Sequence, residues 1–251
     1  MQDLYFKIIL LKKIIPILFL INLISAQDNH HEIWSKFSVD KSFSEKIKGE
    51  LEYQIRFQDN ATIDNGSIKY PLLSSVRIWG SYNIDKHFSM LFSPFAYFQI
   101  SPLIAKETDL DKKKVYENRY TLMFEYKNEL LKKTSFMNRF GFEYRDFKNT
   151  SLDYFRMREK GTLKFDLNSK VAVLASDEVF FNMTSKENTK FFDQNRVSLL
   201  LNYSPIKDLR FEVGGLFCSK NQKMIEQNIH ENVLIFNTCV ILDKKREKNG
   251  N

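Results

Sequence analysis

The feature that most constrains this chain is a strict alternation of apolar and polar residues. Between residues 46 and 58 the apolar side chains and one glycine take every second position, and polar or charged side chains lie between them. The apolar set is Ile47, Gly49, Leu51, Tyr53, Ile55 and Phe57. Successive side chains of a β-strand point to opposite faces, whereas a helix would scatter these charges around its axis. The pattern therefore predicts a long β-strand with one apolar and one charged face.

The same alternation recurs along the rest of the chain. It is clean in seven segments, 46–58, 76–84, 119–126, 136–145, 155–165, 196–203 and 209–217, and weaker in 33–39, 88–100, 171–182 and 232–242. Short connections take turns with longer polar ones, and no segment has a convincing helical period. Strands of about ten residues with alternating short turns and long loops are typical of transmembrane β-barrels. We predict an all-β fold, an antiparallel transmembrane β-barrel of about 10 to 12 strands with a polar, charged lumen.

A soluble β-sandwich would show the same alternation, because its strands also have one buried and one solvated face. The composition of the apolar face favours the barrel. This face is aromatic over many strands, and rings gather near predicted strand ends at Tyr53, Phe57, Tyr126, Tyr144 and Tyr203, where membrane barrels carry aromatic girdles. Single-chain bacterial barrels have an even number of strands. We therefore expect either that 33–39 is not a full strand or that another strand lies within 61–73.

The first 26 residues have the composition of a secretory signal peptide. Three lysines precede an apolar run from Ile14 to Ile24, and Ser25 and Ala26 supply the small residues of a cleavage site. The apolar run is about half of the roughly 20 residues that span a bilayer as a helix, so an uncleaved anchor is the weaker alternative. The predicted organisation is a signal peptide at 1–26, an outer-membrane barrel at 27–242 and a charged, disordered tail at 243–251. Export would end in the bacterial outer membrane.

The charge of the chain gives little support to a nucleic-acid partner. The formal net charge is +7, and the predicted signal peptide and tail carry much of this excess. The barrel itself is close to neutral, unlike a nucleic-acid-binding domain. The expected partners are outer-membrane lipid and the barrel-assembly machinery, with no nucleic acid and a monomeric barrel.

The charged face of the strands forms the candidate site. Its members would point into the lumen: Glu50, Glu52, Arg56, Glu117, Arg119, Glu125, Arg139, Glu143, Arg145, Arg156, Arg158, Glu178, Arg196, Arg210 and Glu212. The favoured interpretation is a structural or surface-interaction barrel whose salt-bridged interior fills a narrow lumen, since buried charges are tolerated only when they are paired. The other is a narrow pore in which an arginine ring sets anion preference.

Two further chemistries are weaker. Asp177 and Glu178 are adjacent, so a regular strand would aim one of them at lipid unless a bulge or a rim position intervened. With Asp193 they could supply oxygen ligands for a divalent cation, although their spacing matches no calcium loop. A lipid hydrolase would need a serine with a histidine in reach. His87 and His230 lack a serine nucleophile motif, so we expect no catalytic residue, no metal and no cofactor.

Cys218 and Cys239 are the two cysteines, and they lie in consecutive predicted strands. A hairpin that turns near residue 225 would place Cys218 opposite a residue near 231. We therefore expect two unpaired thiols.

Several motifs occur in an order that resembles an uncharacterised outer-membrane β-barrel family of Gram-negative bacteria, domain of unknown function 2490. They are Trp34, Glu50-x-x-x-Gln54-x-Arg56-Phe57, Glu117-Asn118-Arg119, Asn138-Arg139 through Glu143-Tyr144-Arg145, Arg156-Met157-Arg158, Ala175-Ser176-Asp177-Glu178-Val179-Phe180, Phe192-Asp193-Gln194-Asn195-Arg196 and Leu209-Arg210-Phe211-Glu212-Val213-Gly214. The resemblance covers almost all of the chain after the predicted signal peptide. It implies an outer-membrane barrel without established activity, and it adds no catalytic residues.

Overall fold

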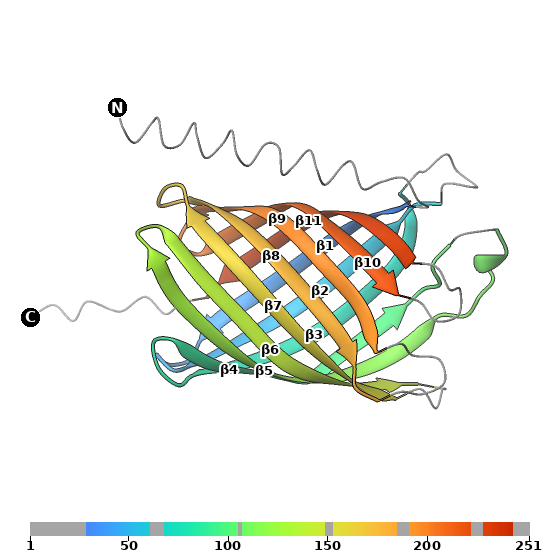
Figure 1. Ribbon diagram of the computed structural model, residues 1–251, viewed down its shortest axis with the longest axis horizontal. Helices are drawn as coiled ribbons and strands as arrows, with labels where there is room; N and C mark the ends of the chain where they lie inside the picture. The colour runs from blue at the N-terminus through green and yellow to red at the C-terminus, as the bar shows by residue number, and fades with distance from the viewer. Residues whose placement is uncertain are drawn as a thin grey trace, which may run out of the picture.

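The computed structural model describes residues 29–60, 68–104, 107–148, 153–184, 191–221 and 228–242. Within these ranges eleven strands form one closed barrel (Figure 1). The strands are β1 (Asn29–Ser42), β2 (Ile47–Gln58), β3 (Tyr70–Asn83), β4 (Phe88–Ile100), β5 (Val115–Leu131), β6 (Thr134–Phe147), β7 (Tyr154–Asp166), β8 (Val171–Asn182), β9 (Phe192–Ile206), β10 (Leu209–Asn221) and β11 (Asn228–Ile241), with one 3-10 helix, η1 (Glu107–Asp109). The predicted signal peptide and charged tail lie outside the described residues.

The eleven predicted strands are all present, and each hydrogen bonds to its neighbours in the chain. The expectation of an even count is wrong. Residues 33–39 belong to a full strand, β1, and the end of the 61–73 segment is the beginning of β3. With an odd number of strands, the first and the last run in the same direction. The barrel therefore closes through a parallel pair, β1 with β11, while the other ten pairs are antiparallel.

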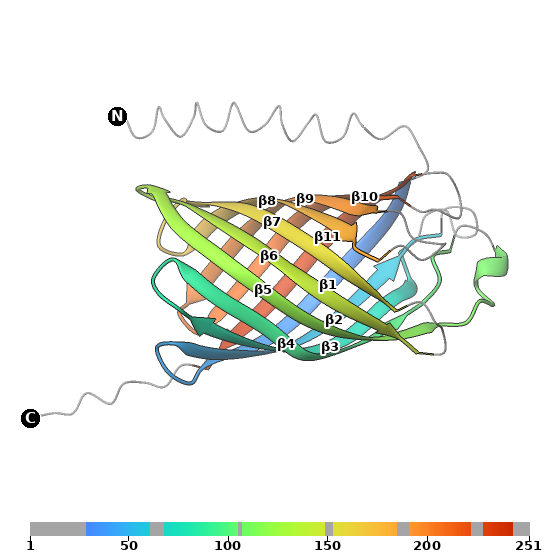
Figure 2. The same cartoon turned by 60° about the horizontal axis from the view of Figure 1, so that its bottom comes forward.

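The strands turn their apolar side chains outward. Leu51 is 52% exposed, Phe124 47% and Phe236 45%, and many similar side chains share this outer surface. Charged side chains alternate with them on the inner face, so the outside is apolar and the interior polar. This is the arrangement of a transmembrane β-barrel, and the closed sheet excludes the two-layer sandwich. Figure 2 shows the strands of the closed sheet from a second direction.

The predicted aromatic girdle is only partly at the strand ends. Tyr144 and Tyr203 each lie three residues before the end of their strands, β6 and β9. Tyr53 lies in the middle of β2. The alternation identified the outward face of Tyr53 correctly but not its height on the barrel.

Short turns join strands at one rim of the barrel, and three of them are built on a side-chain acceptor. Ser44 Oγ accepts from the backbone N–H of Ile47, and Asn168 Oδ1 accepts from Lys170 and Val171. Asp85 Oδ1 accepts from the backbone N–H groups of the residues two and three positions later, at 2.7 and 2.8 Å. These two bonds hold the pKa of Asp85 below its ordinary value. We call this end the short-turn rim and the opposite end the long-loop rim.

Two glycines on the inner face allow close approach of neighbouring backbones. A Cβ on Gly214 would lie 2.1 Å from the carbonyl oxygen of Leu199, and a Cβ on Gly141 would lie 2.4 Å from that of Leu122. Neither contact could be relieved by a side-chain rotation, because the obstructing atom is backbone. The barrel wall therefore requires glycine at both positions.

Candidate functional site in the barrel lumen

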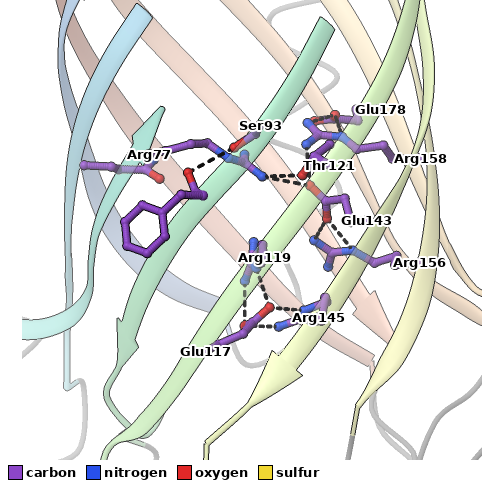
Figure 3. A network of polar contacts seen from close by, with 12 residues as sticks. Arg77, Ser93, Glu117, Arg119, Thr121, Glu143, Arg145, Arg156, Arg158 and Glu178 are labelled. Atoms are coloured by element: carbon purple, nitrogen blue, oxygen red, sulfur yellow. Dashed lines mark hydrogen bonds and ion pairs between the residues drawn. The ribbon is translucent and has the colours of Figure 1, made fainter. Parts of the chain in front are cut away.

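A completely buried glutamate, Glu143 on β6, forms the centre of the polar network in the lumen (Figure 3). Its carboxylate accepts from Arg156 Nη2 at 2.6 Å and from Arg158 Nη1 at 2.9 Å. Arg77 Nη2 lies 3.5 Å from Glu143 Oε1 and donates to Thr121 Oγ1 at 2.7 Å. Arg77 belongs to β3, and β4 and β5 separate it from β6. These contacts therefore cross the lumen instead of following the wall.

A second buried glutamate, Glu117 on β5, lies nearer the long-loop rim. It accepts from Arg119 Nε at 2.5 Å and from Arg145 Nε and Nη2 at 2.6 and 2.7 Å. Arg145 also donates to the hydroxyl of Tyr154. Two arginines thus share one carboxylate, which resembles the way three arginines share Glu143.

Aromatic rings inside the lumen stack on these guanidinium groups. Three arginine Cζ atoms lie near the Phe180 ring: Arg156 and Arg196 at 4.7 Å and Arg158 at 5.2 Å from its centroid. Arg119 Cζ lies 3.8 Å from the centroid of Phe98. A guanidinium stacked on a ring is partly shielded from water and gains a cation–π contact. The rings therefore fill space between the charges without removing their donors.

Trp34 on β1 is the third such ring. Arg56 Cζ lies 3.5 Å and Arg196 Cζ 5.0 Å from its centroid, while the indole Nε1 donates to Glu32 Oε2 at 2.5 Å. Arg56 is the cross-strand neighbour of Trp34, but Arg196 belongs to β9, beyond β11 and β10. This cluster also extends across the lumen.

We call the charges and rings that take part in these clusters the closure layer. Its basic and acidic members are Arg56, Arg77, Arg119, Arg145, Arg156, Arg158, Arg196 and Lys220 with Glu32, Glu117, Glu143, Glu178, Asp193 and Glu231, and its rings are Trp34, Phe98 and Phe180. The layer occupies the half of the lumen nearer the long-loop rim. Side chains in direct contact across the interior leave water no access to Glu117, Glu143 or Glu231, each 0% exposed.

Segments at the long-loop rim cover the layer further. Gln58, Asp59 and Asn60, at and just after the end of β2, are buried. Gln58 Nε2 donates to the carbonyl of Pro102, and its Oε1 accepts from the backbone N–H of Ile104. The segment that follows β4 is thereby tied to the end of β2.

The other half of the lumen, toward the short-turn rim, is more open to water. Arg210 has a side chain 38% exposed and lies 3.6 Å from Asp40, and Arg139 is 37% exposed with Glu125 at 2.5 Å. Lys36 lies 3.8 and 3.5 Å from Glu50 and Glu52, and Glu212 accepts from the side-chain amides of Asn202 and Asn237. We call this half the vestibule.

Sequence reasoning placed its candidate residues on the inner face, and the structure divides them between two levels. Arg56, Glu117, Arg119, Glu143, Arg145, Arg156, Arg158, Glu178 and Arg196 lie in the closure layer, and Glu50, Glu52, Glu125, Arg139, Arg210 and Glu212 in the vestibule. Sequence reasoning did not include Arg77, Glu32, Lys220 or Glu231 among the site residues, nor assign Trp34 to the lumen. Arg77 could have been found, because it has the same alternation as the residues that were chosen.

The three carboxylates of the suggested cation site do not meet. Glu178 points inward and binds Arg158, and Asp193 lies 3.1 Å from Arg156 Nη1. Asp177 is exposed on the outer face in the middle of β8, and neither a bulge nor a rim position intervenes, since the register is continuous there. Its Oδ1 accepts from Asn195 at 2.6 Å. Among the residues the structure describes, no group of three or more potential ligands could hold a metal ion.

His87 and His230 contact a backbone carbonyl and an aromatic ring, and the two cysteines are unpaired. His87 Nδ1 lies 3.0 Å from the carbonyl of Lys127, and His230 stacks on Phe217 at 5.5 Å between centroids. In the described ranges neither ring is hydrogen bonded to a serine. Cys218 and Cys239 are free thiols, and Cys218 lies opposite Glu231 as the hairpin predicted.

Comparison with known proteins adds the family. A family model described as a protein of unknown function (DUF2490) matches residues 31–228, from β1 to the beginning of β11. The chain belongs to the DUF2490 family. The resemblance drawn from the ordered motifs is thereby confirmed. No curated protein matches the chain.

One solved structure similar to this DUF2490 chain is a porin described as "NanC porin structure in rhombohedral crystal form". The two share 10% sequence identity at a TM-score of 0.49, and the match covers 81% of this chain and 93% of the porin. Within the described ranges, no helix has the length and apolar character to cross a membrane.

Proposed function

We propose that this chain is an integral outer-membrane barrel with a closed lumen, which acts as a structural or surface-interaction element and not as an open diffusion pore. The observation that carries the proposal is the cross-lumen contact of Arg77 on β3 with Glu143 on β6, inside a layer of buried ion pairs. A water-filled porin keeps its charged side chains along the wall and leaves the axis free. Here charged side chains of strands that are not neighbours in the wall contact each other inside the lumen.

The membrane location rests on the outer face of the barrel. Large exposed apolar side chains lie on every strand except β8, and so large an apolar surface would not be stable in water. Membrane barrels of this kind have short periplasmic turns and longer external loops. We therefore assign the short-turn rim and the vestibule to the periplasm and the closure layer to the cell exterior.

Conductance in planar lipid bilayers tests the closed lumen. Wild-type protein should give no large ohmic steps. A double variant, Arg77→Ser with Glu143→Ser, removes the cross-lumen contact and should produce larger steps. The matched control is Lys36→Ser with Glu50→Ser, which removes an ion pair in the vestibule and should leave the current unchanged. Porin-sized steps from the wild type would refute the proposal.

A second candidate function is a narrow pore with anion preference. It is favoured by one observation, the presence of more arginines than carboxylates in the closure layer. If small steps occur, the reversal potential in a salt gradient should indicate anion preference. Replacing Arg196 and Arg210 with Gln should lower that preference. An unchanged reversal potential would remove this candidate.

A further inference from the structure

The closure layer is not electrically balanced. It has eight basic and six acidic side chains, namely Arg56, Arg77, Arg119, Arg145, Arg156, Arg158, Arg196 and Lys220 against Glu32, Glu117, Glu143, Glu178, Asp193 and Glu231. Among the described residues, six of the basic groups lie within 4.0 Å of a carboxylate of the layer. The two that do not are Arg56 and Arg196.

These two arginines lie at the same place. Both guanidinium groups contact the ring of Trp34, at 3.5 and 5.0 Å from the centroid. Glu32, two residues before Trp34, accepts from the Trp34 indole, and within the described ranges it makes no ion pair within 4.0 Å with either arginine. Two positive charges therefore share one aromatic ring with no described carboxylate within 4.0 Å of either, and Glu32, Glu178 and Glu231 act on them only from a greater distance.

Their donors are also incompletely used. Nε of Arg56 and Nε of Arg196 are both buried and have no hydrogen-bond partner. Arg56 Nη2 donates to Gln54 Oε1 at 3.2 Å. Stacking engages the face of a guanidinium and not its N–H edge, and that edge matches the two oxygens of a carboxylate or phosphate. A buried charge without a partner is costly, so an anion from solution would stabilise the pair.

We propose that Arg56 and Arg196, held on the ring of Trp34, form a binding site for a small oxyanion, a carboxylate or a phosphate, inside the closure layer. This inference does not require the lumen to conduct. The site would hold one anion at the level where the surplus positive charge lies.

The test uses quenching of Trp34 fluorescence by iodide in the full barrel folded in detergent. The chain has two tryptophans, so a Trp79→Phe background leaves Trp34 as the only one. If iodide binds between the arginines, the quenching of Trp34 fluorescence should saturate as the iodide concentration rises. Fluoride keeps the ionic strength constant during the titration. Acetate or phosphate should displace the iodide. A linear curve, or displacement by neither oxyanion, would overturn the proposal.

Substitutions locate the site. Arg56→Gln and Arg196→Gln should each raise the half-saturating iodide concentration about tenfold, because each removes one charged donor group. Arg196→Lys keeps the charge and should have a smaller effect. The matched control, Arg210→Gln in the vestibule, should leave the curve unchanged. If quenching saturates at the same iodide concentration in the wild type and in both Gln variants, the iodide binds elsewhere and the site is refuted.

Folding and conductance are measured on the same samples. Quenching by neutral acrylamide should be equal in all variants if Trp34 keeps its environment, and Arg196→Lys serves if Arg196→Gln does not fold. Large conductance steps from the wild-type protein would refute the closed lumen but would leave the oxyanion site standing. Linear iodide quenching refutes the site without affecting the closed lumen.

Discussion

Replacing Glu143 with glutamine should destabilise the barrel more than any comparable change in the vestibule. The substitution keeps the size and shape of the side chain and removes its charge. Glu143 is completely buried, and Arg77, Arg156 and Arg158 share its carboxylate at 3.5, 2.6 and 2.9 Å. Glutamine offers one acceptor oxygen, and its amide nitrogen would face a guanidinium.

The magnitude follows from the partners. Arg158 keeps Glu178 and Arg156 keeps Asp193, but among the described residues Arg77 has no other carboxylate within 4.0 Å. Breaking a buried ion pair by removing one partner costs about 3 to 5 kcal/mol, because the remaining charge is left uncompensated. The two arginines with second partners lower the cost, so we expect a loss of about 3 kcal/mol for Glu143→Gln.

The assay is reversible unfolding by urea in lipid vesicles, read as the free energy from midpoint and slope. Glu50→Gln is the control, because Glu50 is partly exposed and shares Lys36 with Glu52. Its loss should stay under about 1 kcal/mol, as for a solvated pair. Equal losses for the two variants would show that the closure layer is not a dry network, and the reasoning would fail.

Three further predictions follow from the wall. Leu51→Arg should cost about 2 to 4 kcal/mol in vesicles, whereas Ile47→Arg at the strand end should cost about 0 to 1 kcal/mol; equal costs would contradict the membrane placement. Gly214→Ala should lower the unfolding midpoint because its Cβ meets backbone, while the adjacent Gly215→Ala, whose Cβ has nothing nearer than 4.0 Å, should fold as the wild type does; the reverse order would contradict the described wall. The exported protein should fractionate with outer membranes and require detergent for extraction, and a soluble periplasmic monomer would disprove this.

The strands were predictable because alternation is a local property. Each strand records its own inward and outward positions, so even the weaker segments 33–39 and 171–182 identified β1 and β8. The closing pair was not predictable in the same way. The direction of β1 relative to β11 depends on the total count of strands, and the general preference for even numbers pointed away from the correct count.

The sequence predicted which residues face the lumen, but not the level along the barrel axis at which each one lies. Alternation places Glu143 and Glu50 on the same inner face, yet one is buried and the other partly exposed. The difference arises from the stagger of neighbouring strands, which determines which inner residues of distant strands meet. Arg77 reaches Glu143 only because β3 and β6 are staggered to bring them to one level.

The parallel closure has a consequence for how the two ends of the barrel can be reached. β1 begins at the long-loop rim, and β11 ends at the short-turn rim, where Leu242 N donates to the carbonyl of Asp40. A barrel with an even number of strands would begin and end at the same rim. With the orientation proposed above, we expect an epitope inserted immediately before Asn29 to be stained on intact cells, and one inserted after Leu242 to be stained only after the outer membrane is permeabilised.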